Sequence, residues 1–151
     1  MHLRTLVVLC ILPVLALGAG KLVLNKRYQL ASSENFEDFM KAIGVGFFTR
    51  KIGNAVSPVI ELIENNGEYS LYSNSTFKNT VTRFRLGQEF DEETPDGRTV
   101  KSLITLEDGN KLIHVQKGDK VSKIVRTFDE DEVKMILTVD DIVCTRIYKP
   151  I

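Results

Sequence analysis

The chain has 151 residues, with 20 lysine and arginine side chains against 20 aspartate and glutamate side chains, and 43% of its residues are hydrophobic. This length allows one compact domain and excludes a tandem architecture, while the balanced charge excludes the basic surface typical of nucleic-acid binding. Its two cysteines, Cys10 and Cys144, are too few for a disulfide framework or a cysteine-rich metal site.

The first twenty residues are predicted to be a leader. A short basic start at 1–4 precedes an apolar run at 6–17 that carries no charge, and small residues follow at 18–20. A membrane-spanning helix needs about 20 apolar residues, so this shorter run is typical of a cleavable secretory signal. An uncleaved anchor or a buried helix is the alternative. We therefore expect a signal peptide at 1–20, a folded domain at 21–151 and a secreted mature protein.

The rest of the chain alternates short β patterns with turn residues such as Asn66-Gly67 and Asp108-Gly109. Ten strands are expected, at 26–31, 59–64, 69–73, 80–85, around 90, 99–106, 112–116, 121–128, 132–139 and 142–148. That number favours a closed barrel or a strongly bent double sheet over an open sheet. The predicted fold class is therefore all-β, a ten-stranded antiparallel up-and-down β-barrel.

A helical pattern replaces the β pattern between residues 33 and 56. The i, i+3, i+4 and i+7 spacing of one helix face is met by Phe36, Phe39, Met40 and Ile43. Asn35 is the expected N-cap, with Asp38 at the capping-box position, and residues 44–46 end the helix. A second short helix is predicted, with an apolar face made by Phe48, Ile52 and Val56. This helical pair between the first two strands is either a lid or a packed plug.

Two arginines stand among apolar residues on predicted strands. In the last strand the period of two puts Cys144, Arg146 and Tyr148 on one face, and in the eighth strand Arg126 lies between large apolar side chains. An arginine on a solvated outer face is the ordinary interpretation. If Arg126, Arg146 and Tyr148 instead face a partly hydrated interior, they can donate charge-assisted hydrogen bonds to an anionic head group.

Several long blocks resemble the fatty acid-binding protein family. They are YQLASSENFEDFMKAIGVG at 28–46, TRK at 49–51, STFKNT at 75–80, LGQEFDE at 86–92 and VCTRIY at 143–148. The blocks occur in the right order and the resemblance covers nearly all of residues 24–149. It implies a clam-like ten-stranded β-barrel, a helix-turn-helix lid between the first two strands, and an internal cavity for one or two lipid molecules.

The resemblance also implies a ligand. In the long-chain fatty acid branch, two arginines and a tyrosine hold the carboxylate, and the matching positions here are Arg126, Arg146 and Tyr148. Retinol-binding relatives carry glutamines at the arginine positions, so an acidic lipid is expected. Retinoic acid-binding relatives share the arginine and tyrosine pattern, which leaves retinoic acid or another acidic lipid as the alternative to a long-chain fatty acid.

Further cavity and portal positions follow. The match assigns Phe36, Met40, Val45, Pro58, Phe77, Asp96 and Arg98 to the cavity or its mouth, and strand alternation adds Ser73, Ser75 and Cys144. Basic portal residues that in relatives help contact anionic membranes are matched by Lys41, Arg50, Lys51 and Lys78. The ordinary alternatives are core packing for the apolar positions, a turn for Asp96 and Arg98, and a solvated lid face for the four cations.

Enzyme signatures are missing from the sequence after the leader. His114 is its single histidine, no nucleophile elbow occurs, and no spacing of histidine, cysteine and aspartate suits a metal. We therefore interpret His114 as an ordinary strand residue and expect a monomeric lipid carrier without catalytic residues, metal or cofactor. A lipid-modifying enzyme, or a secreted interaction protein with a structural lipid, is the alternative of a different class.

One modification signal remains in the predicted secreted domain. Asn74-Ser75-Thr76 is the only N-x-S/T sequon in the chain. If Ser73 and Ser75 face the cavity, Asn74 faces outward, and export would expose it to N-glycosylation.

Overall fold

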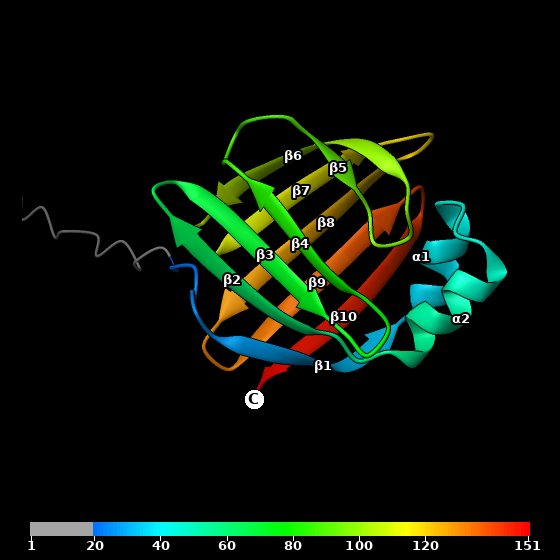
Figure 1. Cartoon of the computed structure of the whole chain (residues 1–151), viewed down its shortest axis with the longest axis horizontal. Coiled ribbons are helices and arrows are strands. Elements are labelled where there is room, and N and C mark those ends of the chain that lie inside the picture. Colours follow the sequence, from blue (N-terminus) through cyan, green and yellow to red (C-terminus); the bar gives the residue numbers. More distant parts are fainter. Residues whose placement is uncertain (1–19) are drawn as a thin grey trace, which may run out of the picture.

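Residues 20–151 are described by a computed structural model, so the predicted leader lies outside the described residues except for Gly20. Within this range the chain forms ten strands and two helices (Figure 1). They are β1 (Arg27–Glu34), α1 (Phe36–Ala42), α2 (Phe47–Ala55), β2 (Val59–Asn65), β3 (Glu68–Asn74), β4 (Asn79–Phe84), β5 (Phe90–Glu93), β6 (Thr99–Glu107), β7 (Lys111–Lys117), β8 (Val121–Asp129), β9 (Glu132–Val139) and β10 (Ile142–Pro150). The predicted fold class is confirmed, including the helical pair between the first two strands.

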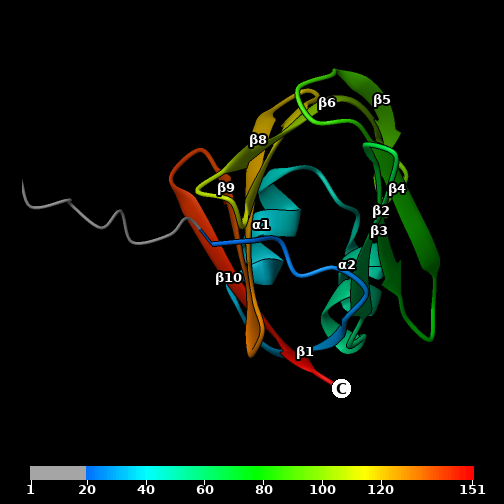
Figure 2. The same ribbon diagram turned by 90° about the vertical axis from the view of Figure 1, so that its left-hand side faces the viewer.

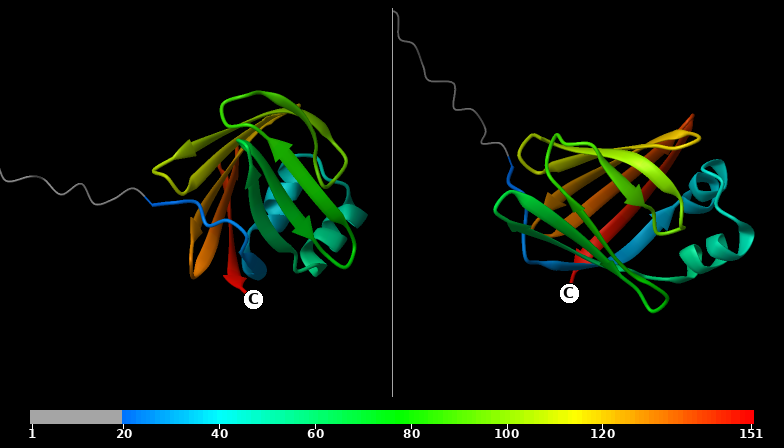
Figure 3. Two further views of the ribbon diagram at one scale, coloured as in Figure 1. Left: turned by 60° about the vertical axis from the view of Figure 1, so that its left-hand side comes forward. Right: turned by 45° about the horizontal axis from the view of Figure 1, so that its top comes forward.

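The strands form one antiparallel sheet in the order β4-β3-β2-β1-β10-β9-β8-β7-β6-β5. Figures 2 and 3 show the sheet bending round on itself, with both helices at one end. The last strand pairs with the first, so the C-terminal strand joins the two halves of the barrel. Hydrogen bonding is interrupted only between β4 and β5, the two ends of the sheet order, so the barrel is nearly closed.

Aromatic side chains bridge the two unpaired edges. The rings of Phe84 on β4 and Phe90 on β5 stack with centroids 6.4 Å apart, and Tyr69 on β3 stacks on Phe84 at 5.4 Å. Offset aromatic pairs at such distances are favourable. Side-chain packing therefore joins β4 to β5 where the backbone ladder does not.

The hairpin turn between β2 and β3 follows from its sequence. Asn66 and Gly67 both have positive φ, 50° and 82°, which is the requirement of the tight hairpin turn whose twist matches the strands. The Gly67 amide also donates to the Glu64 side chain at 2.7 Å. The Asn-Gly pair thus fixes the register of the β2–β3 hairpin.

Helix α1 begins where predicted, but its capping interactions are different. Asn35 has φ 62° and ψ 21°, and its side chain makes no capping hydrogen bond. Its Nδ2 instead donates to the carbonyl of Val143 at the start of β10, at 3.1 Å. Asn35 is the N-cap residue, as predicted, but the expected capping box with Asp38 does not form, because the left-handed backbone turns the Asn35 side chain toward the sheet.

The face of helix α2 that points toward the barrel interior is not the face that the sequence predicted. Its inward positions, at the spacing of one helix face, are Thr49, Ile52, Gly53 and Val56. Phe48 falls outside this face and is 80% exposed, so the prediction that Phe48 belongs to the buried face was wrong. A Cβ on Gly53 would lie 2.9 Å from the Sδ of Met40, so the absence of a side chain at Gly53 lets α2 approach α1.

The core lies on the inner face of the sheet. Its fully buried members include Leu62, Ile104, Leu112, Phe128 and Val133, from five different strands. Tyr28 is also fully buried, and its hydroxyl donates to the carbonyl of Asp129 at 2.7 Å. Neither helix is long and apolar enough to cross a membrane, a statement that covers residues 20–151.

Candidate functional site

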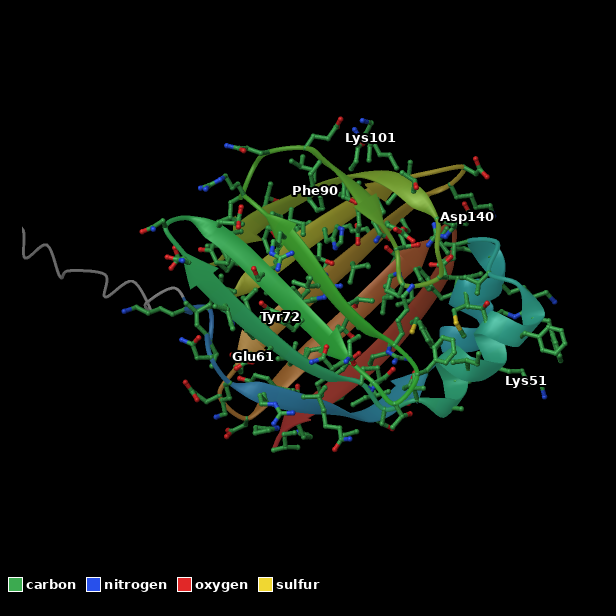
Figure 4. All side chains as sticks on the ribbon, viewed as in Figure 1. Lys51, Glu61, Tyr72, Phe90, Lys101 and Asp140 are labelled. Atoms are coloured by element: carbon green, nitrogen blue, oxygen red, sulfur yellow. The ribbon has the colours of Figure 1, made fainter. Side chains whose placement is uncertain are left out.

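A cavity of about 250 Å³ lies inside the barrel, next to the helices. Both helices and most of the strands contribute side chains to its wall, and the interior side chains are drawn in Figure 4. This volume is close to the lower end of the range of about 300–1,000 Å³ for small-molecule pockets. The wall is mainly apolar, with a small number of buried charged and polar groups.

The three residues of the predicted head-group site lie together on the cavity wall. Arg126 on β8 stands opposite Met135 on β9, and Met135 stands opposite Arg146 on β10. Directly opposite residues in an antiparallel sheet share a face, so the two arginines flank Met135 on the inner side. Tyr148 follows Arg146 on the same face of β10, and all three side chains line the cavity. They are not on a solvated outer face.

Arg146 is buried with part of its hydrogen-bonding capacity unused. It is 3% exposed, and its Nη1 donates to Ser33 Oγ at 3.0 Å. Its guanidinium carbon lies 3.8 Å from the ring centroid of Phe36, an arrangement that favours a cation. The Nε atom is buried and has no partner among the described residues. A buried donor without a partner is costly, so this end of the cavity favours an acceptor.

Sequence reasoning missed a buried carboxylate in the cavity wall. Glu92 on β5 is 7% exposed, and a single oxygen, Oε1, accepts three hydrogen bonds. The donors are Ser102 at 2.6 Å, His114 at 2.9 Å and Gln116 at 3.1 Å. Burial raises the pKa of Glu92, but the hydrogen bonds from His114, Ser102 and Gln116 lower it, and the positive charge of a protonated His114 lowers it further, so the pKa lies below the usual range. Glu92 is therefore an ionised group inside the barrel.

His114 connects the Glu92 carboxylate to the guanidinium of Arg126 through hydrogen bonds. Its Nε2 faces Glu92, and its Nδ1 lies 3.1 Å from Nη1 of Arg126. Because an arginine N–H can only donate, Nδ1 must accept, which assigns the neutral ring with its proton on Nε2. Burial and the nearby Arg126 charge lower the pKa of His114 and outweigh the opposite effect of Glu92, in agreement with a neutral ring. Burial also lowers the pKa of Arg126, but its ordinary value is high enough to keep it charged.

A signal for this network was present in the strand pattern. Ser102, His114 and Gln116 all occupy inward positions, since they alternate with outward residues on β6 and β7. Polar residues at inward positions of neighbouring strands indicate an internal hydrogen-bond network. His114 is thus part of such a network and not the ordinary strand residue that we predicted.

Most of the predicted portal residues line the cavity. These are Phe36, Met40, Val45, Pro58, Ser73, Ser75, Phe77, Asp96 and Arg98, together with Lys78 from the predicted basic group. Phe77 is 61% exposed, so it stands at the solvent edge of the cavity. Cys144 is fully buried in the core and is not among the lining residues, so it packs beside the cavity wall without forming it. Asn74 is exposed at the end of β3.

Asp96 and Arg98 form an ion pair at the cavity mouth. Arg98 donates from Nε to Asp96 Oδ2 at 2.6 Å and from Nη2 to Oδ1 at 3.1 Å. Burial opposes ionisation of Asp96, yet the hydrogen bonds from Arg98 and Thr94 lower its pKa. Both residues therefore remain charged and neutralise each other.

The four predicted membrane-contact cations differ in their surroundings. Arg50 donates to Glu37 at 2.8 Å and to the carbonyl of Val45 at 2.7 Å, so its hydrogen bonds join α2 to α1 and to the turn between them. Lys78 donates to the carbonyl of Pro95 at 3.2 Å. Lys41 and Lys51 are exposed and form no ion pair within residues 20–151. Figure 4 shows Lys51 extending from α2 away from the barrel.

Metal binding has no candidate in the part of the chain that the structure describes. Groups of three or more histidine, cysteine, aspartate or glutamate side chains that could hold a metal ion do not occur in residues 20–151.

Comparison with known proteins gives a consistent match. The Lipocalin / cytosolic fatty-acid binding protein family matches residues 26–150. The muscle fatty acid-binding protein of Schistocerca gregaria is 52% identical over 124 residues, which is 82% of this chain and 92% of that protein. Among solved structures, a fatty acid-binding protein from brain tissue of Drosophila melanogaster has a TM-score of 0.80 and 51% identity, covering 83% of this chain and 98% of that chain. A Schistosoma mansoni fatty acid-binding protein in complex with arachidonic acid has a TM-score of 0.81 and 37% identity, over 83% of this chain and 94% of that one.

Proposed function

The chain belongs to the lipocalin / cytosolic fatty-acid binding protein family, and we propose that it binds and carries a long-chain fatty acid in its internal cavity. In this proposal the carboxylate is held by Arg126, Arg146 and Tyr148. The observation that carries it is the pair of arginines flanking Met135 on an otherwise mainly apolar cavity wall, with the buried Nε of Arg146 lacking a partner. A lipid carboxylate supplies the acceptor, and its chain fills the apolar remainder.

The apolar chain provides most of the affinity. Burying about sixteen carbons at ~0.8 kcal/mol per methylene offers on the order of 12 kcal/mol before ordering and association costs. Each charged hydrogen bond to the head group adds about 1.5–3 kcal/mol. We therefore expect low-micromolar or tighter binding, with the arginines setting orientation and the preference for acids.

A displacement titration tests the head-group assignment. Palmitate and hexadecanol compete for the cavity against a fluorescent fatty acid, in wild type and in Arg146→Gln. Palmitate should lose affinity in the variant, by about tenfold or more, while hexadecanol changes little, because only the acid carries the charge that Arg146 binds. Arg83→Gln is the matched control, since Arg83 is exposed on β4 and does not line the cavity. Equal losses for acid and alcohol would contradict the assignment.

Retinoic acid is the alternative ligand, because the same head-group residues suit any lipid carboxylate. We favour a flexible acyl chain over a rigid ring system because relatives that match most of this chain are named fatty acid-binding proteins. Retinoic acid should therefore displace the probe less effectively than palmitate. Stronger displacement by retinoic acid would reassign the ligand.

We propose a carrier and not an enzyme, in agreement with the names of the relatives. In the buried polar network, Glu92 Oε1 and both ring nitrogens of His114 are engaged in hydrogen bonds, and the Cys144 thiol lies outside the cavity lining. Incubation with a lipid ester should give reversible uptake and no released product. If delipidation abolishes folding, the lipid is structural and the carrier function is rejected.

We also propose transient membrane contact by the helical segment. Phe47 and Phe48 at the start of α2 are both exposed, at 57% and 80%, and their rings form an edge-to-face pair. Lys51 lies 5.2 Å from the Phe47 ring centroid, so apolar rings and a cation occur side by side. Transfer of a fatty acid to anionic vesicles should slow in the Phe48→Ser variant and should be insensitive to Glu107→Gln, an exposed change at the end of β6. Equal transfer rates would reject this contact.

Export of the protein is proposed from the sequence of the leader. An intact-mass measurement on protein released by producing cells tests it, together with the predicted cleavage and N-glycosylation of Asn74. Loss of residues 1–20, with or without an added glycan mass, is the expected result for the exported protein. A mass that corresponds to 1–151 would reject the export proposal.

A further inference from the structure

The charges inside the cavity do not balance without a ligand. Six charged residues line it, namely Lys78, Glu92, Asp96, Arg98, Arg126 and Arg146. The Asp96–Arg98 ion pair is neutral as a unit, and Lys78 is exposed at the edge. The interior therefore contains two arginines and one carboxylate, which leaves one net positive charge.

The single interior carboxylate, that of Glu92, is linked by hydrogen bonds to Arg126 and not to Arg146. Arg126 donates to Nδ1 of His114 at 3.1 Å, and Nε2 of the same ring donates to Glu92 at 2.9 Å. Arg146 instead donates to the uncharged hydroxyl of Ser33. The carboxylate lies on the side of Arg126, two hydrogen bonds away along a chain of buried groups.

We propose that Glu92 is a positioning residue that acts on Arg126 through His114, and that it makes the cavity select lipids with one negative charge over lipids with two. The inference rests on the proposed function and adds the charge selectivity of the same site. Glu92 fixes the guanidinium of Arg126 through the neutral imidazole. It also offsets one arginine charge, so a single carboxylate completes the neutralisation of the interior.

The physical basis is the cost of unpaired buried charge. In a low-dielectric interior an uncompensated charge destabilises the protein far more strongly than at the surface. With Glu92 in place, a monoanion brings the interior charge to zero, and a dianion leaves an excess negative charge. Without Glu92, two arginine charges remain, and a dianion becomes the better match.

The test compares two lipids with the same sixteen-carbon chain. Palmitate has one negative charge, and hexadecyl phosphate is largely a dianion at pH 8, because the second pKa of a phosphate monoester is about 6. In the Glu92→Gln variant the ratio of palmitate to hexadecyl phosphate affinity should fall by about tenfold or more relative to wild type. Glu93→Gln is the matched control, since Glu93 is the exposed neighbour on β5 with the same charge. An unchanged ratio in Glu92→Gln would overturn the proposal.

A double variant keeps the test valid if Glu92→Gln does not fold. Glu92→Gln with Arg126→Gln removes both charges and keeps the one net positive charge of wild type, whereas Arg126→Gln alone leaves a net interior charge of zero. The double variant should therefore bind palmitate about tenfold more tightly than Arg126→Gln alone. Equal affinities would overturn the proposal. Failure of the proposed function itself is distinguishable, because wild type would then bind neither lipid.

Discussion

Burial controls the chemistry of individual side chains in this barrel. Cys144 is fully buried, and burial raises the pKa of its thiol to about 11, although the Arg146 charge acts in the opposite direction. A thiol with that pKa is almost entirely protonated at neutral pH. Since the thiolate is the reactive form, Cys144 is expected to be inert.

Cys144 should resist alkylation in the folded protein. With iodoacetamide at pH 8, the peptide that contains Cys144 should remain unmodified in native protein and become modified in urea, as measured by mass spectrometry. Modification of native protein at the rate seen in urea would show that the residue is accessible, which contradicts the buried position in β10.

Glu92 should link stability to acid pH. Its pKa in the folded chain lies below the ordinary value of 4.5, so its charged form stabilises the fold. This contribution is complete above the unfolded-state value and is lost as the pH falls through the lower folded-state value. In urea titrations, wild type should be more stable than Glu92→Gln at pH 7, and the difference should shrink below pH 4.5. A difference that grows on acidification would reverse the assigned direction.

The sheet depends on packing where its ladder is interrupted. Phe84 is 3% exposed and stacks between Tyr69 and Phe90, which places it across the unpaired edges of β4 and β5. Main-chain ladder pairing is absent between these two strands, so side-chain contacts such as this aromatic stack join them. The integrity of this side of the barrel should therefore be sensitive to Phe84.

Substitution of one buried and one exposed phenylalanine by alanine compares the contribution of the β4–β5 contact to stability with that of the surface of helix α2. Phe84→Ala should lower the free energy of unfolding by about 3–5 kcal/mol, the usual cost of deleting a buried aromatic. Phe48→Ala, at an 80% exposed position, should change it by less than about 0.5 kcal/mol. Urea denaturation of both variants gives the comparison, and similar losses would contradict the assigned burial.

Strand positions were predictable because each strand buries one face, so inward and outward residues alternate along the sequence. That same alternation put Arg126 and Arg146 on faces shared with apolar residues, but it did not decide between the inner and the outer face, and the family resemblance supplied the inward assignment. The phase of short helix α2 was not predictable from apolar spacing, because Thr49 and not Phe48 occupies the inward position. The Glu92–His114 contact was also missed, since it joins residues 22 positions apart through strand pairings that periodicity does not reveal.

At the scale of the whole molecule, the pairing of β1 with β10 brings distant parts of the chain to one site. Ser33 on β1 and Arg146 on β10 are 113 positions apart, and they meet because the two strands pair. A register shift between Leu30 and Ser32 precedes this contact and aligns Ser33 with Arg146. Phe36, at the start of α1, then packs on the same guanidinium, so the head-group end of the cavity contacts the helical segment.

The central claim is that a lipid carboxylate binds inside the barrel beside Arg126 and Arg146. Palmitate labelled with ¹³C at its carboxyl carbon reports the ionisation of that group by NMR when it is bound. Because two guanidinium groups favour the charged form, the carboxyl signal should keep its ionised position from pH 7 to pH 4. A signal that titrates with a midpoint near the ordinary carboxyl value of about 4.3 would place the head group in solvent and contradict the account.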